Sequence, residues 1–242
     1  MSLSSSTRLQ IISHRGATTE SIKENTIDAF QHAIDMQADM IETDVRQTKD
    51  GKLVCAHNPD WNGIMLKEIT YENWKKNTEA KEGWRPPLLT EVLHLCEGVI
   101  PLNLELKEHG LEERVISRLP ASYPIHDILF SSFEDEVIKK IKSMNETFQT
   151  ALIVGKSLFS SSSKKFSYWK DFYPENRLKQ AKADAICPHY RLANKSFVDR
   201  MHKHGYEVNV WTVNSAEKIK KIQGARVDGI FTDNVVLAQK QL

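Results

Sequence analysis

The chain has 242 residues, of which 33 are lysine or arginine and 32 are aspartate or glutamate, so its formal net charge is +1. This balance excludes an overall field that would attract nucleic acid or an anionic membrane, and it leaves any anionic ligand to a local site. The length predicts one domain over residues 1–242, because single α/β barrels commonly run to about 250 residues.

The cysteines and the N-terminal residues bear on the cellular compartment. Cys55, Cys96 and Cys187 are far apart and lack the paired short spacing of a zinc or redox motif. Residues 1–10 contain no apolar signal segment, and no run of about 18 apolar residues predicts a membrane span. We therefore expect reduced, structural thiols in a cytoplasmic protein.

The first strand and helix are predicted near the N-terminus. Residues 9–13 form a short apolar run that ends at His14-Arg15-Gly16, which indicates a buried strand followed by a turn. From Asn25 onward the apolar residues recur at helical spacing.

The second strand carries two acidic residues on one face. In residues 39–45 polar and apolar side chains alternate, so Glu42 and Asp44 project from the same side. An Asp-Gly turn at 50–51 then predicts a hairpin, with a short returning strand at 52–56.

Residues 58–89 show no clean periodicity and predict an insertion after the second strand. The segment is either a packed cap or a wall of the substrate mouth, and its aromatic and sulfur-containing side chains suit both interpretations: Trp61, Met65, Trp74 and Trp84. Thr90 is the predicted N-cap of a helix that continues to Cys96.

The third main strand, at 99–107, places Asn103, Glu105 and Lys107 on one face and leucines on the other. Strand and helix patterns then alternate to the C-terminus, with a long loop at 157–174 and a helix beginning near Glu175. The later strands are predicted at 127–131, 150–154, 184–187, 207–211 and 229–232.

Eight strands alternating with helices predict a (β/α)8 TIM barrel with a small insertion after the second strand, and a doubly wound open sheet is the alternative. In such a barrel the active site lies at the carboxyl ends of the strands. The polar candidates follow the predicted strands at that end: His14, Glu42, Asp44, Glu105, Lys107, Ser131, Lys156, His189, Trp211 and Asp233.

Several short runs, in this order, resemble the glycerophosphodiester phosphodiesterase family over almost the whole chain. They are His14-Arg15-Gly16, Glu24-Asn25-Thr26, Glu42-Thr43-Asp44-Val45, Thr48-x-Asp50-Gly51, His57, Asn103-Leu104-Glu105-Leu106-Lys107, Ser131-Ser132-Phe133, Trp211-Thr212-Val213-Asn214 and Thr232-Asp233. The resemblance implies a TIM barrel that uses a divalent cation to release glycerol 3-phosphate and an alcohol from glycerophosphodiesters.

The resemblance also implies roles for individual residues. By motif position, the metal ligands are Glu42, Asp44 and Glu105, the acid/base pair is His14 and His57, and the phosphate-binding residues are Arg15 and Lys107. Trp211, Glu24 and Asn25 are further candidates for the substrate pocket, although Asn25 is equally well placed to cap a helix.

Two positions depart from the family pattern. Asn58 follows His57 where an aspartate is usual, which puts in question either the orientation of His57 or the outer shell of the metal. The proline that commonly follows Thr232-Asp233 is absent, and we expect this to affect only how the last helix starts.

These residue types suit phosphodiester chemistry. Three carboxylates without a nearby thiolate form a hard oxygen site for Mg²⁺ or Ca²⁺, and two histidines can share the proton transfers. Attack by the glycerol 2-hydroxyl, through a cyclic phosphate, and direct attack by water both remain open. The expected partner is a small glycerophosphodiester, and a homodimer is one open oligomeric state.

Two other functions remain open from the sequence. A lysophospholipase D-type activity on phospholipids is suggested by the tryptophans of the insertion and by an aromatic loop: Phe159, Phe166, Tyr168, Trp169 and Phe172. A non-catalytic phosphoester-binding protein is the second, with Asn58 as the sign of lost chemistry.

Overall fold

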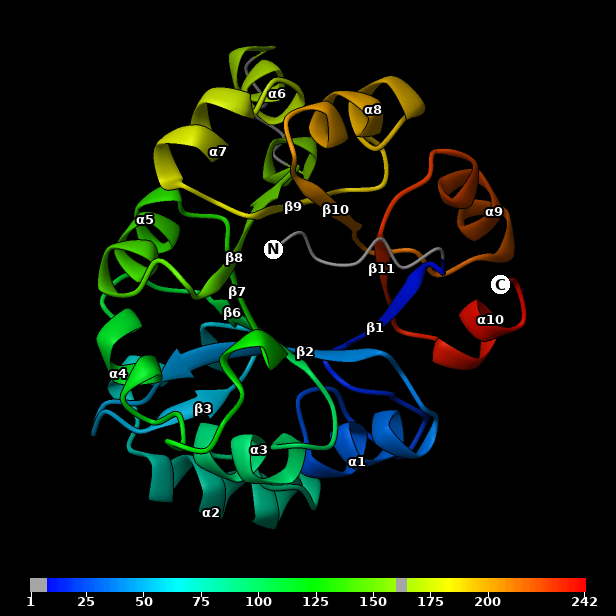
Figure 1. The fold of residues 1–242 in the computed structure, drawn as a ribbon. Coiled ribbons are helices and arrows are strands. Elements are labelled where there is room, and N and C mark those ends of the chain that lie inside the picture. The colour runs from blue at the N-terminus through cyan, green and yellow to red at the C-terminus, as the bar shows by residue number, and fades with distance from the viewer. Residues whose placement is uncertain (1–7, 160–164) are drawn as a thin grey trace.

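The computed structural model describes residues 8–159 and 165–242, without the side chains of 159 and 165–168. Eight parallel strands form a closed ring, in the order β1, β11, β10, β9, β8, β7, β6 and β2, with β2 pairing back to β1 (Figure 1). The predicted barrel is confirmed. The eight strands are β1 (Gln10–His14), β2 (Met40–Gln47), β6 (Leu102–Leu106), β7 (Ile128–Ser132), β8 (Gln149–Val154), β9 (Ala185–Pro188), β10 (Glu207–Val210) and β11 (Gly229–Thr232).

The helices surround the strands on the outside of the ring (Figure 1). They are α1 (Ile27–Asp35), α2 (Tyr71–Glu82), α3 (Leu89–Cys96), α4 (Glu112–Ile116), α5 (Asp135–Met144), α6 (Lys165–Phe172), α7 (Glu175–Ala181), α8 (Lys195–Lys203), α9 (Ala216–Gly224) and α10 (Val235–Gln239). Three short 3₁₀ helices accompany them: η1 (Leu66–Glu68), η2 (Ile125–Asp127) and η3 (Lys156–Phe159). None of the helices within the described residues is long and apolar enough to cross a membrane.

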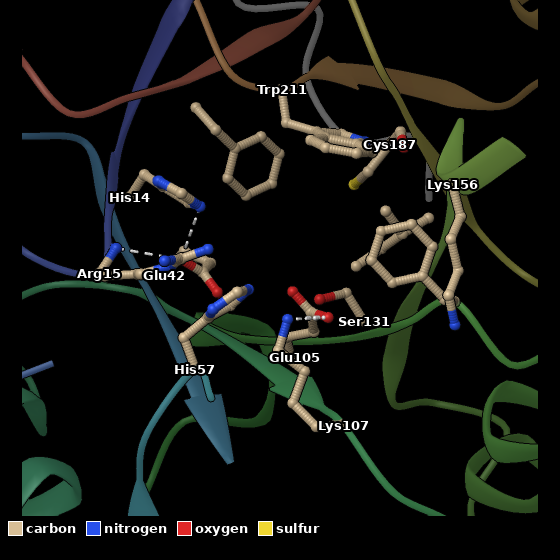
Figure 2. Close-up of a pocket in the computed structure, with 13 residues that line it drawn as sticks. His14, Arg15, Glu42, His57, Glu105, Lys107, Ser131, Lys156, Cys187 and Trp211 are labelled. Atoms are coloured by element: carbon tan, nitrogen blue, oxygen red, sulfur yellow. Dashed lines mark hydrogen bonds and ion pairs between the residues drawn. The ribbon is translucent and has the colours of Figure 1, made fainter. Parts of the chain in front are cut away.

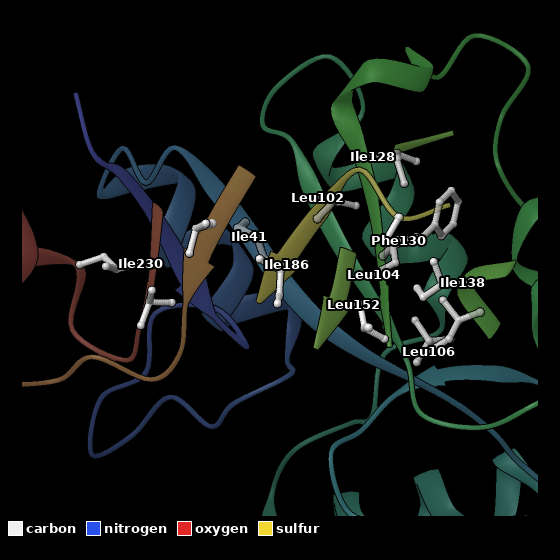
Figure 3. Packing of buried hydrophobic residues seen from close by; sticks show 14 of the residues in the cluster. Ile41, Leu102, Leu104, Leu106, Ile128, Phe130, Ile138, Leu152, Ile186 and Ile230 are labelled. Carbon is white, nitrogen blue, oxygen red and sulfur yellow. The ribbon is translucent and has the colours of Figure 1, made fainter. Parts of the chain in front are cut away.

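Successive side chains of each strand point alternately outward and inward, so the barrel has an outer and an inner apolar layer. Leu102, Leu104 and Leu106 of β6 are buried in the outer layer between strands and helices, together with Phe130 and Leu152 (Figure 3). The opposite faces of the strands fill the barrel interior with a smaller cluster: Ile12, Leu129, Ala151, Ile153, Ala185, Cys187 and Phe231. The two-residue period therefore sends Asn103 and Glu105 of β6 toward the interior.

The insertion has its own core beside β3 (Leu53–Cys55), which pairs antiparallel with β2 through the predicted hairpin. Its elements are β4 (Asp60–Trp61), β5 (Ile64–Met65), η1 and α2, and its core contains Val54, Trp61, Leu66, Ile69, Tyr71 and Trp74. Trp61 and Trp74 are buried in this core.

Two details of the expected elements are wrong. The helix α3 begins at Leu89 with Leu88 as N-cap rather than Thr90, because Glu91 Oε2 accepts a hydrogen bond from the Leu88 N–H at 2.8 Å. The segment 157–174 is not simply a loop, since it contains α6. Of the aromatic residues expected there, the side chains of Phe159, Phe166 and Tyr168 lie outside the described part of the chain.

Candidate active site

A cavity of about 350 Å³ opens at the carboxyl end of the barrel. Its walls bring together most of the residues expected from the sequence: His14, Arg15, Glu42, His57, Glu105, Lys107 and Trp211 (Figure 2). The remaining walls come from Ser131, Phe133, Ile153, Lys156, Cys187 and Phe231. The cavity is therefore polar on the side of β1, β2 and β6 and apolar on the opposite side.

Three carboxylates cluster at the polar side, where Glu42 and Glu105 line the cavity and Asp44 does not. Glu42, Asp44 and Glu105 are all buried, and one oxygen of each lies within 4.8 Å of the others. The pairing of β2 with β6 sets this distance, because Asp44 and Glu105 are register partners. Glu42 Oε1 has no hydrogen-bond partner among the described residues, although the atom is buried.

Two cations balance these acids in part. Lys107 Nζ lies 2.8 Å from Asp44 Oδ1 and 2.5 Å from Glu105 Oε1, and Arg15 Nε lies 3.2 Å from Asp44 Oδ2. Three ionised carboxylates and two cations leave one net negative charge in a buried place. Such a charge favours either a proton or a bound cation.

The titration of the carboxylates reflects this imbalance. Burial raises the pKa of Glu42 to about 8, and the charges of Asp44 and Glu105 add to the effect. Burial acts in the same direction on Asp44, but Lys107 and Arg15 outweigh it and hold the Asp44 pKa at about 2. Burial also raises the pKa of Glu105, although Lys107 opposes it.

The turn after β1 places Arg15 between the carboxylates and the surface. Arg15 has a left-handed φ of 59°, and its backbone N–H donates to Glu42 Oε2 at 3.0 Å. Its Nη1 donates to both oxygens of Glu24, at 2.9 and 3.0 Å. The Arg15 guanidinium thus lines the cavity, and its contacts with Glu24 and Asp44 fix its orientation.

Asn25 proves to be a support for the carboxylates and not a helix cap. Its Nδ2 donates to Asp44 Oδ2 at 2.8 Å, and its Oδ1 accepts from Thr43 Oγ1 at 2.7 Å. Thr26 caps α1 instead, since its side chain accepts from the Ala29 N–H. Glu24 and Asn25 do not line the cavity.

His14, the last residue of β1, is held by a carboxylate. Its Nδ1 lies 2.6 Å from Asp233 Oδ1, and its Nε2 lies 4.0 Å from Glu42 Oε2. Asn214 fixes Asp233 in turn, because it accepts from the Asp233 N–H at 2.9 Å and donates to the Asp233 carboxylate. Burial lowers the pKa of His14, but the hydrogen bond to Asp233 and the charge of Glu42 outweigh it, and the net pKa is raised.

His57 follows β3 and lies on the same side of the cavity as His14 and Glu42 (Figure 2). Arg46 anchors its backbone carbonyl with two hydrogen bonds of 3.0 and 2.9 Å. Its Nδ1 lies 3.0 Å from the amide oxygen of Asn58. Burial lowers the pKa of His57, and the charge of Asp44 and the hydrogen bond to Asn58 offset this only in part.

The apolar side is built by aromatic rings. Trp211 packs edge-on against Phe133 at 5.6 Å and donates from Nε1 to the Cys187 carbonyl at 2.8 Å. His189 is buried behind Trp211 and does not line the cavity. All three cysteines are free and buried, as expected for structural thiols.

Asp233 and Asn214 are the positioning residues that reasoning from the sequence missed. Both belong to motifs quoted for the family, but neither was given a role. Only one indication of this role was present in the sequence: Asp233 directly follows the last strand, at the same end of the barrel as His14.

Comparison with known proteins identifies the chain. A sequence model of the glycerophosphoryl diester phosphodiesterase family matches residues 14–237. The chain belongs to this family. It is therefore an enzyme, a glycerophosphodiester phosphodiesterase.

Curated relatives agree over nearly the full length. The chain is 30% identical over 241 residues to the glycerophosphodiester phosphodiesterase of Caldanaerobacter subterraneus subsp. tengcongensis, covering 93% of each protein. It is 30% identical over 245 residues to that of Bacillus altitudinis, covering 93% of this chain and 94% of the relative. It is also 23% identical to human lysophospholipase D GDPD1, covering 92% of this chain and 82% of the relative.

Solved structures share the fold. The glycerophosphodiester phosphodiesterase of Thermotoga maritima matches with a TM-score of 0.78 at 23% identity, covering 97% of this chain and 99% of that one. An Oleispira antarctica phosphodiesterase, solved with its product sn-glycerol-3-phosphate, matches with a TM-score of 0.78 at 22% identity, covering 96% of each chain.

Proposed function

We propose that this enzyme hydrolyses glycerophosphodiesters to glycerol 3-phosphate and an alcohol with a divalent cation, Mg²⁺ or Ca²⁺, held by three carboxylates. The ligands are Glu42, Asp44 and Glu105, His14 and His57 form the acid/base pair, and Arg15 and Lys107 bind the phosphate. The test is release of glycerol 3-phosphate by the purified protein with and without the cation.

The charge of the site carries this proposal. The three carboxylates, Arg15 and Lys107 leave one net negative charge, and a divalent cation would convert it to one net positive charge. The buried, unpartnered Glu42 Oε1 and the all-oxygen donor set suit Mg²⁺ or Ca²⁺. When bound, the cation would stabilise negative charge on the phosphoryl oxygens.

The residues of the chain supply the remaining requirements. Arg15, whose Nε and Nη1 contact Asp44 and Glu24, offers its Nη2 to the phosphate oxygens, and Lys107 offers a point charge. His14 ends β1 and His57 follows β3, and both line the cavity beside Glu42 (Figure 2), so one can take a proton from the attacking hydroxyl while the other gives one to the leaving oxygen. Trp211 and Phe133 form an apolar wall for the carbon atoms of glycerol.

The pH dependence of kcat/KM should be bell-shaped, with limbs on either side of 6.5. The pKa of His57 is lowered from 6.5, so the acidic limb lies below that value. The pKa of His14 is raised from 6.5, so the alkaline limb lies above it. Each limb marks the loss of one required protonation state of the pair.

Asp233→Asn tests the alkaline limb directly. Loss of the Asp233 charge should lower the pKa of His14, so this limb should move to lower pH while the acidic limb stays in place. A carboxylate that orients a functional histidine is typically worth about 10- to 100-fold in activity. An unchanged alkaline limb would show that His14 is not the group whose titration produces that limb.

Deacylated substrates should be preferred over lysophospholipids. Buried residues of the barrel interior close the far side of the cavity: Ile153, Cys187 and Phe231. An acyl chain on the glycerol therefore has no path deeper into the barrel. Steady-state assays should give a higher kcat/KM for glycerophosphocholine than for lysophosphatidylcholine, and the opposite order would favour a lysophospholipase D.

A further inference from the structure

A second cavity, of about 410 Å³, lies between the insertion and the turn that follows β1. Trp61, Trp74 and Trp84 form one side of it, and polar residues of 18–25 form the other. Lys23 and Glu24 are about half exposed, so this side adjoins solvent. None of these tryptophans contributes to the carboxylate cavity.

The tryptophans of the second cavity are held in fixed orientations. Trp74 and Trp84 meet edge-to-face with ring centroids 6.3 Å apart. Glu82 accepts hydrogen bonds from Trp61 Nε1 at 2.7 Å and from Trp84 Nε1 at 2.8 Å. Preorganised aromatic rings of this kind provide contact area without a large loss of side-chain entropy on binding.

Aromatic boxes often bind quaternary ammonium groups, but cations of the chain already use these rings. Lys23 Nζ lies 5.2 Å from the centroid of Trp84, and Lys81 Nζ lies 5.2 Å from that of Trp61. Lys23 also pairs with Glu82 at 2.6 Å. A cationic alcohol would have to displace these ammonium groups or lie close to them.

The polar groups of the second cavity suit hydroxyls instead. Trp74 Nε1 is buried and has no hydrogen-bond partner among the described residues, and the indole that carries it lines the cavity. Thr19, Glu24 and Asp60 bring oxygen acceptors to the same cavity. Asn58 brings an amide, whose oxygen faces His57 Nδ1. A hydroxyl both donates and accepts, and it can therefore use all of these groups.

His57 connects this cavity to the chemistry, because it lines both cavities. A phosphodiester bound at the carboxylates has two substituents that extend in different directions. The glycerol is common to all substrates of the proposed reaction and fits the apolar side of the first cavity, beside Trp211. The second cavity, which adjoins solvent, is then available to the variable alcohol.

We propose that the second cavity binds the leaving alcohol of the substrate and selects neutral polyols, such as glycerol and inositol, over cationic alcohols such as choline. This inference rests on the proposed function, since it assigns the alcohol half of the same substrate. The cavity volume lies within the range of small-molecule sites, about 300–1,000 Å³.

The test compares kcat/KM for glycerophosphoglycerol and glycerophosphoinositol with that for glycerophosphocholine. The wild-type enzyme should prefer the polyol diesters by about tenfold or more, the scale of discrimination by a well-fitted pocket. Trp84→Ala should bring the ratio close to one, and Trp74→Phe, which keeps the ring but removes the N–H, should lower it in part. Trp169→Ala, the same change at an exposed tryptophan of α6, should leave the ratio unchanged.

The outcomes separate the two proposals. Hydrolysis of glycerophosphocholine at least as fast as the polyol diesters, or an equal effect of Trp84→Ala on all substrates, would overturn the polyol site and leave the proposed function standing. Absence of turnover of every diester would contradict the proposed function. Calorimetry with free myo-inositol would then test the polyol site by itself. Binding to the wild type that Trp84→Ala abolishes would support the site, and no binding to the wild type would overturn it.

Discussion

His57→Ala is expected to lower kcat on glycerophosphodiesters by about 10²–10⁴-fold, the usual contribution of one positioned acid or base. The fold should survive, because His57 follows β3 in a half-buried position and its backbone is held through its carbonyl by Arg46. KM should change little, since the imidazole carries no charge toward the phosphate when it is neutral. Steady-state kinetics on glycerophosphocholine would measure both parameters.

His14→Ala should have an effect of similar size, and the double variant should be little worse than either single variant. Residues that act as one unit are strongly non-additive in their effects on the rate. His202→Ala is the matched control, because His202 also pairs with an aspartate, Asp228, at 2.8 Å but lies on the surface at the end of α8. Near-normal kcat in either His14→Ala or His57→Ala would remove the acid/base assignment.

Glu42→Gln is expected to abolish tight binding of the divalent cation and, with it, most of the activity. Glu42 and the register partners Asp44 and Glu105 supply the oxygen donors, and the variant replaces one charged ligand with an amide. In the wild type, Mg²⁺ or Ca²⁺ should raise the melting temperature, because a ligand that binds only the folded state stabilises it. The variant should show a much smaller increase.

The same variant should fold well without metal. Burial raises the Glu42 pKa to about 8, so ionised Glu42 is disfavoured in the metal-free site and a neutral amide can replace it at little cost. Asp44→Asn should differ, since it removes the buried carboxylate that both Arg15 and Lys107 contact and leaves them only Glu24 and Glu105 as partners. Glu113→Gln, at an exposed carboxylate that pairs with Lys140, is the control. An equal rise in melting temperature in wild type and Glu42→Gln would contradict the ligand assignment.

The barrel could be predicted from the sequence because its strands are short apolar runs separated by helices with regular apolar faces. The two-residue period was enough to place Glu42 and Asp44 on one face, and the order of strands brought Glu105 beside them. The helix α2 was missed because few of its residues are apolar, and its buried side chains pack on the small core of the insertion rather than on the barrel.

The parts of the site that were missed depend on contacts distant in sequence. Asp233 lies 219 positions from His14, and only closure of the barrel between β1 and β11 brings them together. The role of Asn25 depended on the left-handed backbone at Arg15 and Asn25, which turns the amide toward Asp44. Asn58 was identified as a departure from the family pattern, but its contact with His57 Nδ1 became visible only in the fold.

The central claim is that the three carboxylates and the two histidines act together on a glycerophosphodiester with a bound divalent cation. It is tested most directly by a ³¹P NMR time course of glycerophosphodiester hydrolysis by the purified enzyme. We expect the glycerol 3-phosphate signal to appear with Mg²⁺ or Ca²⁺, to stop growing after EDTA is added and to resume when the cation is restored. Undiminished hydrolysis after thorough chelation, or no glycerol 3-phosphate at all, would contradict the account.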